Sequence, residues 1–189
     1  MPHPRLLSLC ALLLAASPLR AQQYDVLITG GTVYDGTGAP GRTTDLGIRG
    51  DRIVFVGKAA ARATATQRID AKGLIVSPGF IDPHTHAYEG LPRLNATRRQ
   101  NASSLMQGIT TVVLGADGRG PVDVAKTLDE SERAGLGTNT YVMAGFGTVR
   151  SKVMGSSSAP ATKAQIDSMR ALITQAMREG AFGVGSGLF

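Results

Sequence analysis

The sequence predicts an α/β fold in two parts, a partial β-sandwich over residues 22–77 and a layer or barrel of parallel strands over residues 78–189. Three observations support this prediction. Short stretches of alternating apolar and polar residues, broken at glycine-containing turns, fill the first part. Strand and helix patterns alternate four times in the second part, as they do in parallel β/α folds. The 24 glycines suit the many tight connections that both parts need.

Residues 1–21 have the pattern of a secretory signal peptide. A basic start at Arg5 precedes an apolar stretch over residues 6–16, and cleavage is expected after Ala21. The apolar stretch is about half of the roughly 20 residues that a membrane-spanning helix needs, which argues against a membrane anchor. The sequence therefore predicts a secreted or periplasmic protein. Because Cys10, the one cysteine, lies in this leader, the mature chain is expected to have neither disulfides nor thiolate metal ligands.

The charges of the chain argue against a nucleic-acid partner. Loss of the leader would remove Arg5 and Arg20, leaving 18 basic residues against 14 acidic ones. The remaining basic residues are scattered, and they form no stripe with interleaved aromatic residues. This balance favours solubility.

Three segments of the first part predict short strands. Residues 24–38 alternate around the Gly30-Gly31 turn, residues 45–57 around Gly50-Asp51, and residues 67–79 break at Lys72-Gly73. A module of roughly 50 residues buries little surface, so it is expected to need a partner. The inward positions of a half-buried antiparallel pair are assigned to Ile48, Ile53 and Phe55.

The second part alternates apolar strands with helical patterns. Strands are expected over residues 80–82, 108–115, 138–145 and 181–187, and helical spacing over residues 94–106, 122–134 and 162–179. The last helix is the clearest, because it has one apolar face and ends at Gly180 (the face comprises Ile166, Met169, Leu172, Ile173 and Met177).

Two histidines follow the first of these strands. His84 and His86 are separated by one residue, so in an extended backbone they point to the same face. In a parallel barrel that face is the interior, and the carboxyl ends of the strands carry the chemistry. Two imidazoles there provide half of a metal site, and zinc accepts such ligands. The alternative is a pair of surface histidines in a loop.

Several blocks of sequence resemble a known family. The block "GLIVSPGFIDPHTH" resembles the first barrel strand of the amidohydrolase superfamily, and "YDVLITGGTVYDGTG" and "GDRIVFVG" resemble its N-terminal β-sandwich. "QGITTVVLGADG", "GTVRSKVMG" and "REGAFGVGSGL" resemble the D-aminoacylase branch, the N-acyl-D-amino-acid deacylases. The resemblance implies a partial sandwich followed by the first half of a TIM-like (β/α)8 metal-dependent hydrolase barrel.

The resemblance also implies a metal centre with one or two Zn²⁺ ions, or another divalent metal. His84 and His86 match the histidines that hold the more exposed ion. Asp117 stands where branch members have a cysteine, and its carboxylate can serve as the third ligand. The alternative for Asp117 is a turn residue before Gly118. A second departure is Phe146, at a position where relatives often have a histidine.

Arg150 and Lys152 are the candidates for contact with a substrate carboxylate, since arginine binds carboxylates bidentately. The alternative is a solvated pair in a loop. No catalytic residue is predicted within the chain. A closed barrel has eight β/α units and this chain supplies four, so we expect an N-terminal fragment whose general base lies in a C-terminal part.

The predicted function is that of a secreted metal-dependent amidohydrolase that cleaves C–N bonds, with N-acyl-D-amino acids as small-molecule substrates. Two alternatives stay open. One is a dihydroorotase-like or dipeptidase-like hydrolase of cyclic amides or peptides. The other is a non-catalytic periplasmic binding module that has lost the metal.

Overall fold

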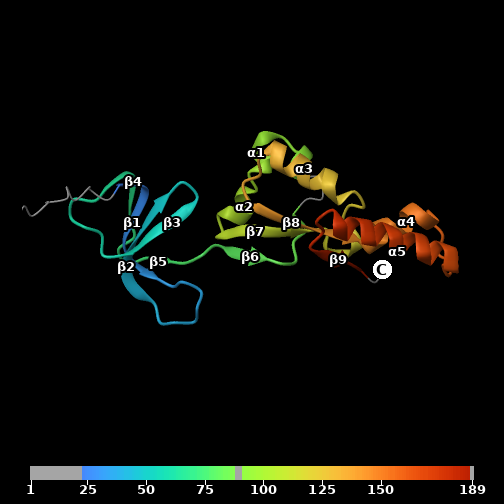
Figure 1. The fold of residues 1–189 in the computed structure, drawn as a ribbon, viewed down its shortest axis with the longest axis horizontal. Helices are drawn as coiled ribbons and strands as arrows, with labels where there is room; N and C mark the ends of the chain where they lie inside the picture. The colour runs from blue at the N-terminus through green and yellow to red at the C-terminus, as the bar shows by residue number, and fades with distance from the viewer. Residues whose placement is uncertain (1–22, 88–90, 188–189) are drawn as a thin grey trace, which may run out of the picture. The chain divides into compact units, whose positions relative to one another are not determined.

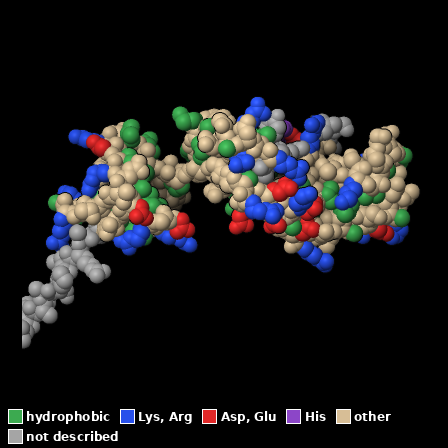
Figure 2. Space-filling view, turned by 90° about the horizontal axis from the view of Figure 1, so that it is seen from above, with side chains coloured by type: hydrophobic (Ala, Val, Ile, Leu, Met, Phe, Trp, Pro, Cys, Tyr) green, Lys and Arg blue, Asp and Glu red, His purple; other side chains and the backbone are tan. Residues whose placement is uncertain are grey.

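The computed structural model describes residues 23–87 and 91–187, so the predicted signal peptide lies outside the described residues. The described chain forms two compact units, one ending at Pro78 and the other beginning at Gly79 (Figure 1). On the face seen in Figure 2, acidic and basic side chains are interspersed on both units. None of the helices in the described residues combines the length and the apolar character that a membrane span requires.

The first unit is a single five-stranded sheet built around β1. This central strand is antiparallel to β2, which is antiparallel to β3, and on its other side β1 is parallel to both β4 and β5. The strands are β1 (Gln23–Val33), β2 (Arg42–Arg49), β3 (Arg52–Gly57), β4 (Thr64–Asp70) and β5 (Ile75–Val76). Within residues 23–78 these strands make one sheet, so the second layer of the expected sandwich stays a prediction.

The core of this sheet lies on the face that carries Tyr24. Tyr24 is buried with Leu27 and Ala63, and its ring centroid lies 5.9 Å from that of Phe55. The Asp45 carboxylate stabilises the same region, because Oδ1 accepts from the Gly30 amide and Oδ2 from the Ala59 amide.

The prediction that Ile53 points inward is wrong, since it is 64% exposed. The cause is a register shift between β2 and β3. Gly47 is opposite Phe55, whereas the next residue, Ile48, is opposite Ile53. Gly47 and Ile48 are neighbours on β2, so they point to opposite faces of the sheet. Their partners Phe55 and Ile53 therefore also point to opposite faces, although they are two residues apart on β3. The bulge therefore separates two side chains that simple alternation places together.

The second unit contains a sheet of four parallel strands in chain order, which confirms the predicted α/β half-barrel arrangement. The strands are β6 (Phe80–Asp82), β7 (Ile109–Leu114), β8 (Asn139–Gly145) and β9 (Gly183–Gly185). Val112, Val113 and Leu114 are all at most 3% exposed, as the uninterrupted apolar run of β7 predicts for a strand covered on both faces.

Helices connect these strands (Figure 1). They are α1 (Ala96–Arg99), α2 (Ala102–Leu105), α3 (Val124–Ala134), α4 (Phe146–Met154) and α5 (Lys163–Arg178), with 3-10 turns η1 (Leu91–Arg93) and η2 (Ala116–Gly118). Asp123 caps the start of α3, because its side chain accepts a hydrogen bond from the Lys126 amide. α5 begins with a capping box formed by Thr162 and Gln165. These caps satisfy amides that have no partner within the helix.

Two helical segments differ from expectation. The helical spacing over residues 94–106 predicts one element, but Asn101 adopts a left-handed backbone (φ 47°) and divides it into α1 and α2. Conversely, the residues around Arg150 form helix α4. Phe146, Val149 and Val153 are spaced by three and four residues, and Val149 is fully buried.

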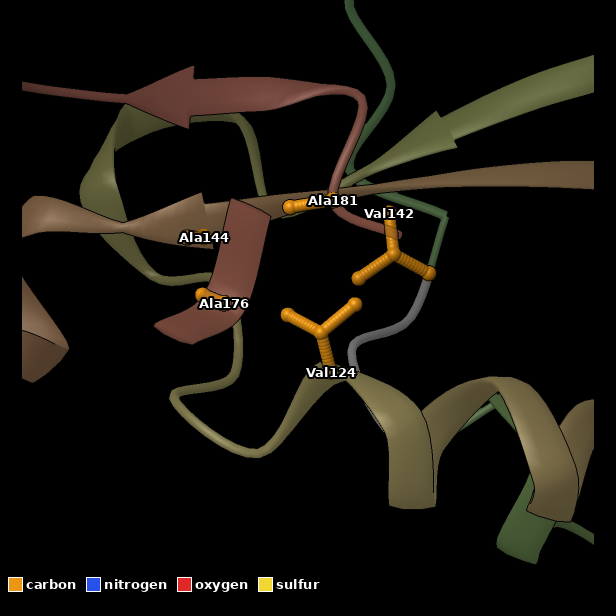
Figure 3. Close-up of a cluster of buried hydrophobic side chains, with 5 residues drawn as sticks. All are labelled: Val124, Val142, Ala144, Ala176 and Ala181. Atoms are coloured by element: carbon orange, nitrogen blue, oxygen red, sulfur yellow. The ribbon is translucent and has the colours of Figure 1, made fainter. Parts of the chain in front are cut away.

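Small side chains form the core between α3, α5 and β8. Figure 3 shows four side chains of these elements lying close together with Ala181, which follows α5 (the four are Val124, Val142, Ala144 and Ala176). Glu179, which follows α5, joins the same elements, because its Oε2 accepts from the amides of Val124 (2.9 Å) and Ala125 (3.2 Å). This ties the end of α5 to the start of α3, and so fixes the helices that cover β8.

Candidate metal centre

The His84–His86 segment lies at the carboxyl end of the sheet. β6 ends at Asp82, whose Oδ1 accepts from the His84 amide at 3.1 Å. Thr85, between the two histidines, donates its hydroxyl to the Val113 carbonyl of β7 at 2.7 Å. This hydrogen bond fastens the segment to the neighbouring strand. The two imidazole rings have centroids 5.7 Å apart and an interplanar angle of 62°.

The structure brings Asp117 to the same place. Asp117 lies in η2, directly after β7, with a left-handed backbone (φ 56°, ψ 28°). Its Oδ1 lies 3.5 Å from His84 Nε2, and its Oδ2 lies 3.3 Å from His86 Nε2. The donor atoms of the three residues all lie within 4.8 Å of one another. Left-handed backbone is best tolerated by glycine, asparagine and aspartate, so Asp117 also suits the turn before Gly118.

Close packing of glycines fixes the loop that carries Asp117. Gly118 is buried with φ +77°, and a Cβ there would lie 3.2 Å from the Gly187 amide nitrogen and 3.3 Å from that of Gly147. A Cβ at Gly120 would collide with the Met143 carbonyl oxygen. The backbones after β7, β8 and β9 therefore pack against one another with no room for side chains.

The geometry of the three side chains fits a divalent ion. Two ligands that each lie about 2.0–2.1 Å from a tetrahedral ion are separated by about 3.3–3.4 Å. The two nitrogen–oxygen separations, 3.5 Å from His84 to one carboxylate oxygen and 3.3 Å from His86 to the other, are close to this edge length. The imidazoles are 64% and 76% exposed and the carboxylate 27% exposed, so a bound ion would keep open coordination positions toward solvent.

Arg150 lines a pocket of ≈ 590 Å³ together with Asp117. Its guanidinium also donates from Nη2 to the carbonyls of Ser157 (2.9 Å) and Ala159 (3.2 Å), and from Nη1 to Met154 Sδ (2.7 Å). Arg150 thus braces the loop after α4, and its predicted contact with a substrate stays a prediction. Lys152 is exposed on the same helix.

Sequence reasoning missed two neighbours of the centre, Thr85 and Arg119, and one ion pair elsewhere in the same unit. Thr85 was treated only as the spacer of the histidine pair. Arg119 lines the pocket beside Asp117, and its position two residues after the candidate ligand is the signal that could have found it. Arg93 donates from Nε to Glu130 Oε2 at 3.0 Å, and this hydrogen bond holds the pKa of Glu130 below its usual range. That pair joins η1 to α3.

This chain matches one known family and is similar to two relatives from one organism. The sequence pattern described as the amidohydrolase family matches residues 67–188. A D-aminoacylase of Alcaligenes xylosoxydans xylosoxydans is 38% identical over 192 residues, covering 89% of this chain and 39% of the relative. An N-acyl-D-aspartate deacylase of the same organism is 37% identical over 190 residues, covering 88% of this chain and 37% of the relative.

The solved structures similar to this chain include a D-aminoacylase and a deacylase. A crystal structure of D-aminoacylase superposes with a TM-score of 0.75 at 36% identity, covering 87% of this chain and 38% of that one. An N-acyl-D-glutamate deacylase of Bordetella bronchiseptica, complexed with zinc and a phosphonate inhibitor, gives 0.77 at 32% identity, covering 88% of this chain and 39% of that one. The chain spans about two fifths of the length of these relatives. Because the amidohydrolase pattern matches residues 67–188, and the chain is 38% identical to a D-aminoacylase, the chain belongs to the amidohydrolase family.

Proposed function

We propose that this chain carries the metal-binding residues of a zinc-dependent amidohydrolase that cleaves the amide bond of N-acyl-D-amino acids. One observation supports this most strongly. Three metal-ligating side chains from the ends of two adjacent parallel strands converge, with their donor atoms within 4.8 Å of one another. The substrate class rests on the deacylases to which the chain is 37–38% identical.

Each residue of the centre has a distinct task in this proposal. His84, His86 and Asp117 would hold a divalent ion, which when bound would supply polarisation of the amide carbonyl and activation of water. His84 and His86 offer Nε2 as neutral ligands, while Asp117 supplies one negative charge that offsets the charge of the ion. Their outward exposure leaves room for the amide beside the ligands. Transfer of the proton to the leaving amine needs a general base, which we place outside the described residues.

Arg150 is suited to orient the substrate. Arginine has five N–H donors, and the hydrogen bonds to Met154, Ser157 and Ala159 use three of them. The two remaining N–H groups, one on Nε and one on Nη1, lie on different edges of the guanidinium, so in the pocket shared with Asp117 each could donate a single hydrogen bond to the carboxylate of an acyl amino acid. Because the loop bonds fix the guanidinium in place, little conformational entropy would be lost on binding.

We further propose that the protein is secreted or periplasmic, on the leader pattern of residues 1–21. N-terminal sequencing of the exported protein should begin near Gln22, whereas a cytoplasmic protein that keeps Met1 would contradict this.

The test is hydrolysis by the protein that carries this chain. N-acetyl-D-amino acids, their L-enantiomers and dihydroorotate are offered with zinc, and release of free amino acid is measured for the acyl amino acids and ring opening to the carbamoyl amino acid for dihydroorotate. We expect turnover of the D-series, and none in the His84→Ala/His86→Ala double variant. Lys58→Ala, a change at an exposed residue of the first unit, is the control and should keep the wild-type rate. Undiminished hydrolysis by the double variant would contradict the proposal, and turnover of dihydroorotate alone would assign a cyclic amide hydrolase.

A further inference from the structure

The metal centre offers only nitrogen and oxygen donors within the described residues. Two imidazole nitrogens and the two oxygens of Asp117 face one another. No cysteine occurs in residues 23–87 or 91–187, because the single cysteine of the chain is Cys10. The sulfur of Met154, on the pocket-lining helix α4, accepts from Arg150 and is therefore engaged elsewhere.

The carboxylate of Asp117 has little freedom to turn away from this centre. Each of its oxygens lies within 3.5 Å of a different imidazole. The backbone that carries it is left-handed at three residues between positions 115 and 118, namely Gly115 (φ 85°), Asp117 (φ 56°) and Gly118 (φ 77°). A Cβ at Gly115 would lie 2.6 Å from the Met143 carbonyl oxygen, so this loop packs directly on β8. The third donor of the centre is thus a carboxylate carried by a backbone that packing holds in place.

The type of donor determines which ions a site prefers. Carboxylate oxygen is a hard ligand and imidazole a borderline one, and together they suit Mn²⁺, Fe²⁺, Co²⁺ and Zn²⁺. Thiolate is soft, and it adds affinity chiefly for soft ions such as Cd²⁺. A site without sulfur therefore gives a soft ion no advantage over a borderline ion of equal charge.

Resting on the proposed metal centre, we propose that Asp117 makes it a hard-donor site, which discriminates between borderline and soft divalent ions. The chain binds Zn²⁺ and Co²⁺ at least as tightly as Cd²⁺. The identity of this one side chain sets that preference, since the two imidazoles are common to any variant at position 117.

The test compares ion affinities of the purified chain with those of two variants. Zn²⁺, Co²⁺ and Cd²⁺ are each titrated in competition with a chromogenic chelator, and the Co²⁺ absorption spectrum is recorded. Asp117→Cys exchanges the hard donor for a soft one. Asp117→Asn keeps an oxygen donor and a residue that tolerates left-handed backbone, but removes the charge. Circular dichroism confirms that each variant is folded.

We expect the wild-type chain to bind Cd²⁺ no more tightly than Zn²⁺, and Asp117→Cys to raise the Cd²⁺ to Zn²⁺ affinity ratio by at least about tenfold. The cysteine variant should also gain a near-ultraviolet sulfur-to-cobalt charge-transfer band. Asp117→Asn should bind all three ions more weakly with an unchanged ratio, which keeps the test decisive if the cysteine variant does not fold.

Two outcomes would overturn the inference. A wild-type chain that prefers Cd²⁺ by tenfold, with zinc binding intact, would refute the role of Asp117 and leave the proposed hydrolase standing. A chain that binds none of the ions would refute the metal centre, and the inference with it.

Discussion

Thr85→Val should weaken zinc binding without touching a metal ligand. The substitution keeps the shape of the side chain and removes only the hydroxyl that donates to the Val113 carbonyl at 2.7 Å. That hydrogen bond is the contact through which the residue between His84 and His86 is fastened to β7. Without it, the segment keeps the bond from the His84 amide to Asp82 and the contacts of the imidazoles with Asp117, but it loses its side-chain hydrogen bond to β7.

The size of the effect follows from the energy of one hydrogen bond. A neutral hydrogen bond contributes a net stabilisation of about 0.5–1.5 kcal/mol. If all of it acts to hold the histidine segment in the form that binds the ion, its loss converts to a roughly 2- to 13-fold weaker zinc affinity. The free energy of unfolding should fall by no more than about 1.5 kcal/mol.

Zinc affinity is measured by chelator competition and stability by urea denaturation. Thr43→Val is the matched control, because Thr43 is exposed on β2 of the other unit. We expect the control to bind zinc as the wild type does. An unchanged zinc affinity in Thr85→Val, with the stability loss present, would show that this hydrogen bond supports the fold and does not position the histidines.

Three further predictions concern the elements around the centre. Hydrogen bonds from the Gln175 side chain and the Ala125 amide hold the pKa of Glu179 below its usual value of 4.5, so they stabilise the fold above about pH 4.5 and are lost as pH falls through the folded-state pKa. Glu179→Gln should therefore flatten the fall in the urea midpoint on acidification, and an unchanged pH dependence would contradict this. Gly118→Ala should lower the free energy of unfolding by about 1–3 kcal/mol and weaken zinc binding. Gly38→Ala, at a similar φ but with open space around it, should lower stability less in a thermal melt. Equal losses of stability in the two variants would refute the packing argument. Arg150→Lys should speed proteolysis of the loop over residues 155–161, since the bonds to the loop carbonyls are lost; an unaltered cleavage rate would count against this brace.

Much of the second unit could be predicted from the sequence, because its strands are continuous apolar runs and its helices are periodic. α5 shows the limit of such patterns. Met169 is buried as expected, but Ile166 and Met177 are 44% and 45% exposed, while Ala176 is fully buried. Periodicity identifies an apolar stripe, and the sheet decides which edge of that stripe is covered. A small alanine faces β8 because α5 packs close to it.

The departures from the predicted fold arise from single backbone events. The bulge opposite Gly47 and Ile48 moves Ile53 to the other face, and the left-handed Asn101 divides a helix in two. Neither event follows from hydrophobic patterning, because both depend on the conformation of one residue.

The candidate site was more predictable than its surroundings. His84, His86 and Asp117 follow strands that are adjacent and parallel, so their convergence follows from topology. The bonds of Arg150 could not be predicted, since they join its side chain to carbonyls seven and nine residues away. Thr85 was missed for a similar reason, because its partner lies 28 residues along the chain.

The central claim is that His84, His86 and Asp117 together hold one divalent ion. Calorimetric titration of zinc into the purified chain, and into the three single alanine variants of these residues, tests it most directly, with Lys152→Ala as control. We predict a single site in the wild type, an unchanged affinity in the control, and an affinity at least about tenfold lower in each of the three variants. Wild-type zinc affinity in all three alanine variants would contradict the claim.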